Sequence, residues 1–99
     1  MIDLGFMNEV RVDAANHIAH TQGGARLGHV DMATLQHNLI TVVGTDSDTG
    51  AGGLTLGGGL GRLAPKWGLT IDNLQSAQLV MADGRILECS ADENPDLFW

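Results

Sequence analysis

Positively charged side chains are scarce in this sequence of 99 residues. Five Lys and Arg stand against twelve Asp and Glu, and the formal net charge is −7. A protein that binds nucleic acid neutralises phosphates with a basic surface, and attachment to an anionic membrane surface also needs clustered basic residues. The five basic residues here do not cluster. The composition therefore excludes nucleic acid as a partner and gives no basis for a polybasic membrane contact.

Cysteine and long apolar runs are lacking as well. Cys89 is the only cysteine, so the chain forms no internal disulfide, which is typical of a reducing cytoplasm. No apolar run approaches the ~18 residues that a membrane-spanning helix requires. The first residues show no basic region or apolar core of a signal peptide. We therefore expect one small cytoplasmic domain, residues 1–99, that is not inserted in a membrane.

Glycine is the residue in excess, with 14 of the 99 positions, about double the usual ~7%. Most of the excess lies in residues 44–61, which read GTDSDTGAGGLTLGGGLG. The glycines alternate with Leu and Thr, whereas a flexible linker would carry Ser and few large apolar residues. Composition alone leaves two interpretations equally open. The segment is either a cradle in which backbone N–H groups bind an anionic ligand, or a packed connector without a ligand.

Hydrophobic spacing predicts the elements before the glycine-rich segment. Residues 9–13 and 17–21 alternate apolar and polar side chains and predict a β-hairpin. Residues 27–39 predict a helix, and the β-branched residues 39–43 predict a buried strand. The expected apolar face of the helix carries Met32, Leu35 and Leu39, with Val30 and Ala33 nearby.

The second half predicts another hairpin between short helices. Residues 60–67 predict a helical turn, which Pro65 interrupts. Residues 75–81 and 85–89 predict two strands joined at Asp83-Gly84, a strong two-residue turn signal. A further helix is expected to start at the capping pattern of residues 90–93 or at Pro95. The predicted fold class is α+β, with two β-hairpins and short helices.

Standard nucleotide motifs do not explain the glycines. The P-loop pattern is absent, because the only lysine, Lys66, follows a proline. Residues 59–64 match the dinucleotide pattern G-x-G-x-x-A, but more glycine precedes them where a buried strand is needed, and Pro65 follows.

Metal sites are equally poorly supported. Asp46 and Asp48 resemble the start of a calcium loop, but Ala51 and Gly57 stand where that loop needs Gly and Glu. His17 and His20 are expected on opposite faces of a strand, so they are not expected to share a metal. We predict no metal site, and we interpret the two aspartates as turn formers.

Several ordered segments resemble one family. They are residues 23–31 (GGARLGHVD), 52–63 (GGLTLGGGLGRL), 66–74 (KWGLTIDNL), 79–87 (LVMADGRIL) and 91–99 (ADENPDLFW). Together they are similar to FAD-linked oxidases with a PCMH-type FAD-binding domain, in particular the berberine-bridge-like and 6-hydroxynicotine-oxidase-like enzymes. The resemblance covers essentially the whole chain, and it is far more specific than any single glycine pattern.

The resemblance implies FAD as the cofactor and a glycine-rich loop beside the flavin and its diphosphate. Family members oxidise small organic substrates by passing a hydride to FAD and then electrons to oxygen. A mostly structural role is implied for Asp72 and Asn73. The residues carried over as cofactor-binding are Thr45, Asp46, Ser47, Thr49, Gly50, Gly52, Gly53, Gly57, Gly58, Gly59 and Gly61.

The sequence also departs from the family. The upstream loop whose His bonds covalently to the flavin does not precede Met1, and Asp46 occupies the position of a Cys that forms a second link in some members. The substrate domain and its acid–base residues are absent, so no catalytic residue is assigned. We therefore expect a piece of the FAD-binding domain, which meets a small-molecule substrate only in a full-length context.

A second hypothesis is a stand-alone remnant without catalytic activity. Trp67, Phe98 and Trp99 would then leave an exposed apolar patch, which favours a homo-oligomer. A third class, a binding module for another anionic ligand, has no positive support in the sequence.

Overall fold

The structure, a computed structural model, describes residues 1–99 and confirms the α+β class. Two antiparallel hairpins alternate with short helices, and each hairpin is a separate two-stranded sheet. In chain order the elements are β1 (Val10–Asp13), β2 (Ile18–Thr21), α1 (Leu27–Leu35), α2 (Ala51–Leu56), α3 (Ala64–Trp67), the 3₁₀ turn η1 (Ile71–Asn73), β3 (Ser76–Val80), β4 (Ile86–Ser90) and α4 (Pro95–Phe98).

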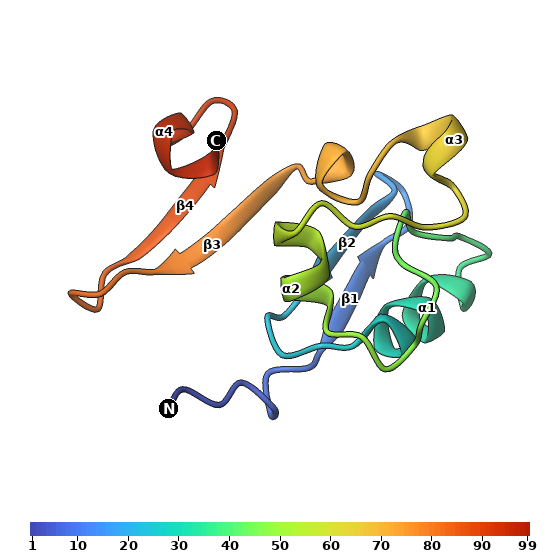
Figure 1. Cartoon of the computed structure of the whole chain (residues 1–99), viewed down its shortest axis with the longest axis horizontal. Coiled ribbons are helices and arrows are strands. Elements are labelled where there is room, and N and C mark those ends of the chain that lie inside the picture. Colours follow the sequence, from blue (N-terminus) through green and yellow to red (C-terminus); the bar gives the residue numbers. More distant parts are fainter.

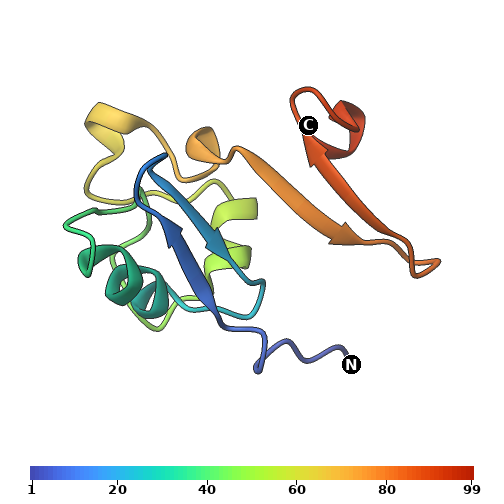
Figure 2. The same ribbon diagram turned by 180° about the vertical axis from the view of Figure 1, so that it is seen from behind.

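The elements form two groups along the chain (Figure 1). The β1–β2 hairpin, α1, α2 and α3 gather in one body, and α1 packs against both strands of the hairpin. The β3–β4 hairpin extends away from this body, with α4 folded against β4 (Figure 2). The overall dimensions of 39 × 29 × 26 Å reflect this projecting hairpin.

Both predicted hairpins are confirmed. In the first, Val10 pairs with Thr21 and Asp13 with Ile18. In the second, Ser76 pairs with Ser90 and Val80 with Ile86. Gly84 has a φ of +88° but Asp83 does not have a positive φ, so the connection is a three-residue loop, closed by the Met81 N–H to Arg85 carbonyl bond, and not the predicted two-residue turn. His17 lies in the first turn with a φ of +54°, so our placement of it on a strand was wrong.

Helix α1 starts at Leu27 as predicted, but it ends before the predicted residue 39 and buries a different face. It ends at Leu35, and Asn38 adopts a left-handed conformation with a φ of +57° just beyond it. The predicted apolar face was wrong, because Met32 and Leu35 are 68% and 60% exposed. The buried residues are Leu27, Val30 and Thr34, at the same i, i+3, i+7 spacing, and of these only Val30 was expected near the apolar face. The buried Thr34 hydroxyl donates to the Val30 carbonyl oxygen at 3.1 Å, which satisfies a polar group on the packed face.

The expected strand at residues 39–43 was wrong, because the segment pairs with neither hairpin, and Ile40 is 67% exposed. Of the two helix starts that the sequence offered near the end of the chain, the structure has the one at Pro95. The pattern at residues 90–93 starts no helix. The Ser90 hydroxyl oxygen accepts from the backbone N–H groups of Asp92 and Glu93, which makes a turn, and α4 begins with Pro95 in its first turn.

The core is small and centres on α1. Leu27, Val30 and Ala51 form the buried cluster, with partly buried Val10, Val43 and Leu54 packed around it. Cys89 is buried on β4 and is a free thiol. No helix of the structure combines the length and apolar character needed to cross a membrane.

The glycines at residues 57–61, called the glycine run below, lie against the chain's own backbone. A Cβ on Gly61 would collide with the carbonyl oxygen of Val43, and one on Gly59 would collide with Thr70. Gly58 and Gly59 also have positive φ angles of +107° and +80°. These positions require glycine for internal packing and backbone conformation.

Replacing Gly61 with Ala is therefore expected to destabilise the fold. The added methyl group would force the Val43 segment aside, at a cost of about 1–3 kcal/mol for overpacking. Gly53→Ala is the matched control, since nothing lies within 4 Å of a Cβ there. Urea unfolding followed by circular dichroism measures both. Equal stability of the two variants would contradict the packing argument.

The first hairpin turn is expected to weaken in acid. The pKa of Asp13 is lowered, first by the Asn16 side-chain amide, which donates to its carboxylate at 2.8 Å, and then by the Asn16 backbone N–H. A lowered pKa in the fold stabilises it above the ordinary value of 3.8, and this contribution disappears as the pH falls through the lowered pKa. Asn16→Ala should raise the Asp13 pKa toward its ordinary value in an NMR titration. An unchanged pKa would mean that the Asn16 side chain is not the main cause.

Candidate functional site: a glycine loop held by the start of a helix

Residues 45–53, called the glycine loop below, are joined to the start of α1 by main-chain hydrogen bonds. The N–H groups of Leu27 and Gly28 donate to the carbonyl oxygens of Thr49 and Ser47, both at 2.9 Å. Arg26 and Gly50 form an isolated antiparallel bridge. From the loop side, the N–H of Ala51 donates to the carbonyl oxygen of Ala25 at 2.8 Å. The loop is thus paired with residues 25–28 along most of its length.

A tight turn shapes the first part of the loop. The Asp46 carboxylate accepts from the Asp48 backbone N–H at 2.9 Å, and the Asp46 carbonyl oxygen accepts from the Thr49 N–H at 3.1 Å. The Arg26 guanidinium lies 3.5 Å from the Asp48 carboxylate, in an exposed ion pair. Both aspartates therefore act in the turn, as the sequence predicted.

The second part of the loop presents unused donors. The backbone N–H groups of Gly52 and Gly53, in the first turn of α2, make no hydrogen bond within the chain. No atom lies within 4 Å of a Cβ built on Gly50 or Gly53, so the space above them is open. Two free N–H groups beside open glycines allow an anionic or polar ligand to approach the backbone closely.

The glycine run differs from the glycine loop in this respect. The carbonyl oxygens of Gly58 and Gly59 accept from the N–H groups of Ile71 and Thr70. A side chain at Gly59 or Gly61 would also collide with neighbouring residues. Internal packing therefore accounts for glycine at Gly59 and Gly61. Whether Gly57, Gly58, Gly59 and Gly61 also contact a cofactor stays a prediction.

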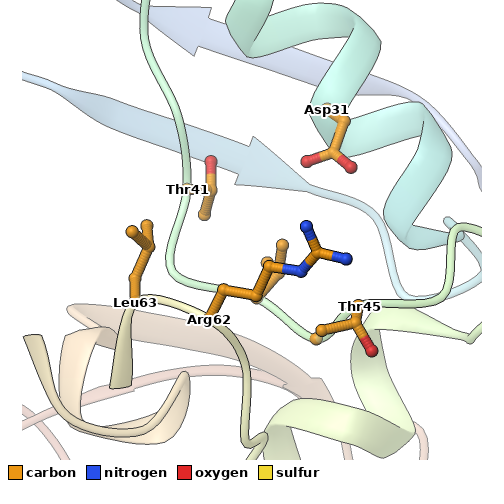
Figure 3. A pocket seen from close by; sticks show the side chains of 7 residues that line it. Asp31, Thr41, Thr45, Arg62 and Leu63 are labelled. Carbon is orange, nitrogen blue, oxygen red and sulfur yellow. The ribbon is translucent and has the colours of Figure 1, made fainter. Parts of the chain in front are cut away.

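A cavity of about 230 Å³ adjoins the start of the glycine loop. Of the predicted site residues, only Thr45 lines it. The Arg62 side chain extends into the space between Asp31 and Thr45 (Figure 3). No carboxylate lies within 4 Å of its guanidinium. The complete lining is Asp31, Thr41, Val43, Gly44, Thr45, Arg62 and Leu63. The sequence reasoning missed Asp31 and Arg62, since nothing in their spacing joins residues 31 positions apart.

The Asp-Asn pair after α3 has the structural role that the resemblance implied. The Asp72 carboxylate accepts from the Leu69 N–H at 2.8 Å. The Asn73 amide donates to the carbonyl oxygens of Trp67 and Leu69, at 3.0 and 2.9 Å. These bonds hold the chain reversal that follows the glycine run.

The family model of the FAD binding domain matches residues 1–90, and the chain belongs to this family. FAD is the cofactor that the family specifies, as the sequence predicted. The backbone donors and open space at the glycine loop fit the diphosphate of such a ligand, while the Asp46 carboxylate is the one charge of the loop that no cation offsets.

Individual relatives support the same family. An FAD-linked oxidoreductase of Aspergillus terreus is 46% identical over all of this chain and 20% of its own length. The crystal structure of 6-hydroxy-D-nicotine oxidase from Arthrobacter nicotinovorans superposes with a TM-score of 0.94 at 41% identity, covering 98% of this chain and 21% of that one. Glucooligosaccharide oxidase from Acremonium strictum gives a TM-score of 0.89 at 44% identity, covering 96% of this chain and 20% of that one. The chain thus spans about a fifth of the length of these proteins.

The Acremonium enzyme carries a 6-S-cysteinyl, 8α-N1-histidyl FAD. Here the glycine loop has Asp46 and no cysteine, and the only cysteine, Cys89, is buried on β4 in the projecting hairpin. A cysteinyl bond to a flavin at the glycine loop is therefore excluded for these residues.

A methyl group on Gly53 should block the cofactor without harming the fold. Gly53 lies inside α2, where Ala is favoured over Gly by about 0.5–1 kcal/mol, and the new Cβ meets no protein atom. If FAD approaches Gly53, we expect Gly53→Ala to weaken FAD binding by about ten-fold or more while the urea midpoint stays equal or rises. Titration by flavin fluorescence measures the affinity. Unchanged affinity in the folded variant would place the cofactor elsewhere.

Proposed function

We propose that this chain forms the flavin-facing part of an FAD-dependent oxidase of small organic molecules, with oxygen as the final electron acceptor. The family, and the oxidases among the relatives that match the whole chain, support this proposal. The observation that carries it is the glycine loop, which offers free N–H groups at Gly52 and Gly53 beside open space. We also propose a cytoplasmic location, on the basis of the single cysteine.

This chain's own part in the reaction is to bind and orient. The chemistry supplied with FAD bound is two-electron oxidation of the substrate. The N–H groups of Gly52 and Gly53 would hold the diphosphate, and the hydroxyl groups of Thr45 and Ser47 lie on the same loop to meet polar atoms of the cofactor. No general acid or base for the substrate is identified among residues 1–99, and the substrate-binding residues are proposed to lie outside them.

Visible absorbance tests the proposal most directly. The purified 99-residue protein is mixed with FAD and desalted, and the flavin bands near ~370 and ~450 nm are recorded. Retained bands, weakened by Gly53→Ala, are the expected result. Bovine serum albumin, treated in the same way, controls for carry-over of free FAD.

The alternative is an inactive protein that assembles as a homo-oligomer. The observation in its favour is the exposed apolar surface, which includes Trp67, Leu60 and Trp99 at 54%, 74% and 87% exposure. A colourless sample that sediments as a folded oligomer would support this alternative and would contradict the flavin-binding function for residues 1–99.

A further inference from the structure

We infer that His29 is a positioning residue for the glycine loop, an inference that rests on the proposed flavin-binding function. The His29 Nδ1 atom accepts from the backbone N–H of Arg26 at 3.0 Å. Arg26 is the N-cap residue of α1, and it is also the residue that pairs with Gly50 of the loop. One imidazole thus fixes the residue through which the helix and the loop meet.

The bond is half of a capping box. In the usual arrangement a Ser or Thr at the N-cap and a Glu or Gln three residues later each accept from the other's backbone N–H. The Arg26 side chain has no acceptor, so only the reverse bond, to His29, is formed. The neutral ring makes it by keeping its proton on Nε2, because an imidazolium donates at both nitrogens.

Without this bond, the orientation of Arg26 would depend on exposed contacts. Its guanidinium pairs with Asp48 over 3.5 Å, and the two side chains are 62% and 87% exposed, so that pair contributes little. Leu27 and Gly28, whose N–H groups donate to the loop, follow Arg26 directly in the chain. These two hydrogen bonds therefore require the backbone at Arg26 to keep its present direction. Loosening Arg26 would therefore loosen residues 47–50 of the loop.

A loosened loop binds its ligand less tightly, because only the ordered fraction is competent to bind. Loss of an N-terminal cap corresponds to about a five-fold increase in the ratio of disordered to ordered loop, and about five-fold is therefore the upper limit of the loss in affinity. His29 does not need to touch the cofactor for this effect. It acts through Arg26, and its role differs from that of the Gly52 and Gly53 donors.

Three variants test the inference. His29→Leu removes the acceptor and keeps an apolar side chain of moderate size, while His29→Gln restores an acceptor at the position where capping boxes carry Gln. His37→Leu is the matched control, since His37 is exposed and lies beyond the end of α1. The first readout is amide hydrogen exchange at Leu27, Gly28 and Ala51 without FAD, and the second is the dissociation constant for FAD from fluorescence titration.

We expect about five-fold faster exchange at the three amides and weaker FAD binding, by at most about five-fold, in His29→Leu, with His29→Gln and His37→Leu close to the unmodified protein. Unchanged exchange in His29→Leu, or no recovery in His29→Gln, would overturn the inference. Equal acceleration at amides of β3 and β4 would overturn it too, because a local anchor does not reach that hairpin. Failure of the unmodified protein to bind FAD would instead refute the proposed function, and the exchange data would still decide whether His29 anchors the loop.

Discussion

The junction between the start of α1 and the glycine loop is the constraint on which the rest of this structure depends. Leu27 and Ala51 donate two of the three main-chain hydrogen bonds that join the two segments, and the same two residues form the buried cluster with Val30. Burial and hydrogen bonding thus coincide at one place. Because the core is so small, with seven of 99 residues buried, few other contacts could replace this junction if it opened. The order of the candidate site and the stability of the fold are therefore coupled.

Local patterns predicted the hairpins well, and longer-range features less well. Both hairpins follow from alternation and short turns, because their partners are adjacent in sequence. The phase of α1 was wrong because the apolar spacing counted only apolar residues, whereas the buried face includes Thr34, whose hydroxyl is satisfied within the helix. The strand at residues 39–43 was wrong because β-branched composition gives no information about a partner strand. Helix α2 was missed because two of its six residues are glycines, which favour helices weakly.

In the candidate site, too, local sequence features were predicted and contacts between distant residues were not. The glycine-rich segment is conspicuous in the sequence, yet its glycines serve different purposes in the structure. Gly50 and Gly53 face open space, whereas Gly59 and Gly61 press against Thr70 and Val43. These partners are 11 and 18 positions away, and no local pattern links them. The family resemblance identified the segment and the cofactor, but only the fold separates open glycines from packed ones. The capping role of His29 was equally hidden, because capping patterns are defined with Glu or Gln at that position.

The net charge of this acidic domain repels an anionic dinucleotide, so the attraction for the cofactor must come from local groups. Of the basic side chains near the glycine loop, Arg26 is already paired with Asp48, and Arg62 points into the neighbouring cavity. The donors that have no acceptor within the chain are the main-chain N–H groups of Gly52 and Gly53. They carry partial positive charges whose direction is fixed by the fold. Partial charges attract an anion strongly only when they are held in place before it arrives, since reorienting them consumes part of the binding free energy. Hence the affinity of this domain for its cofactor should depend on how firmly residues 25–28 hold the glycine loop, and less on the number of its basic residues.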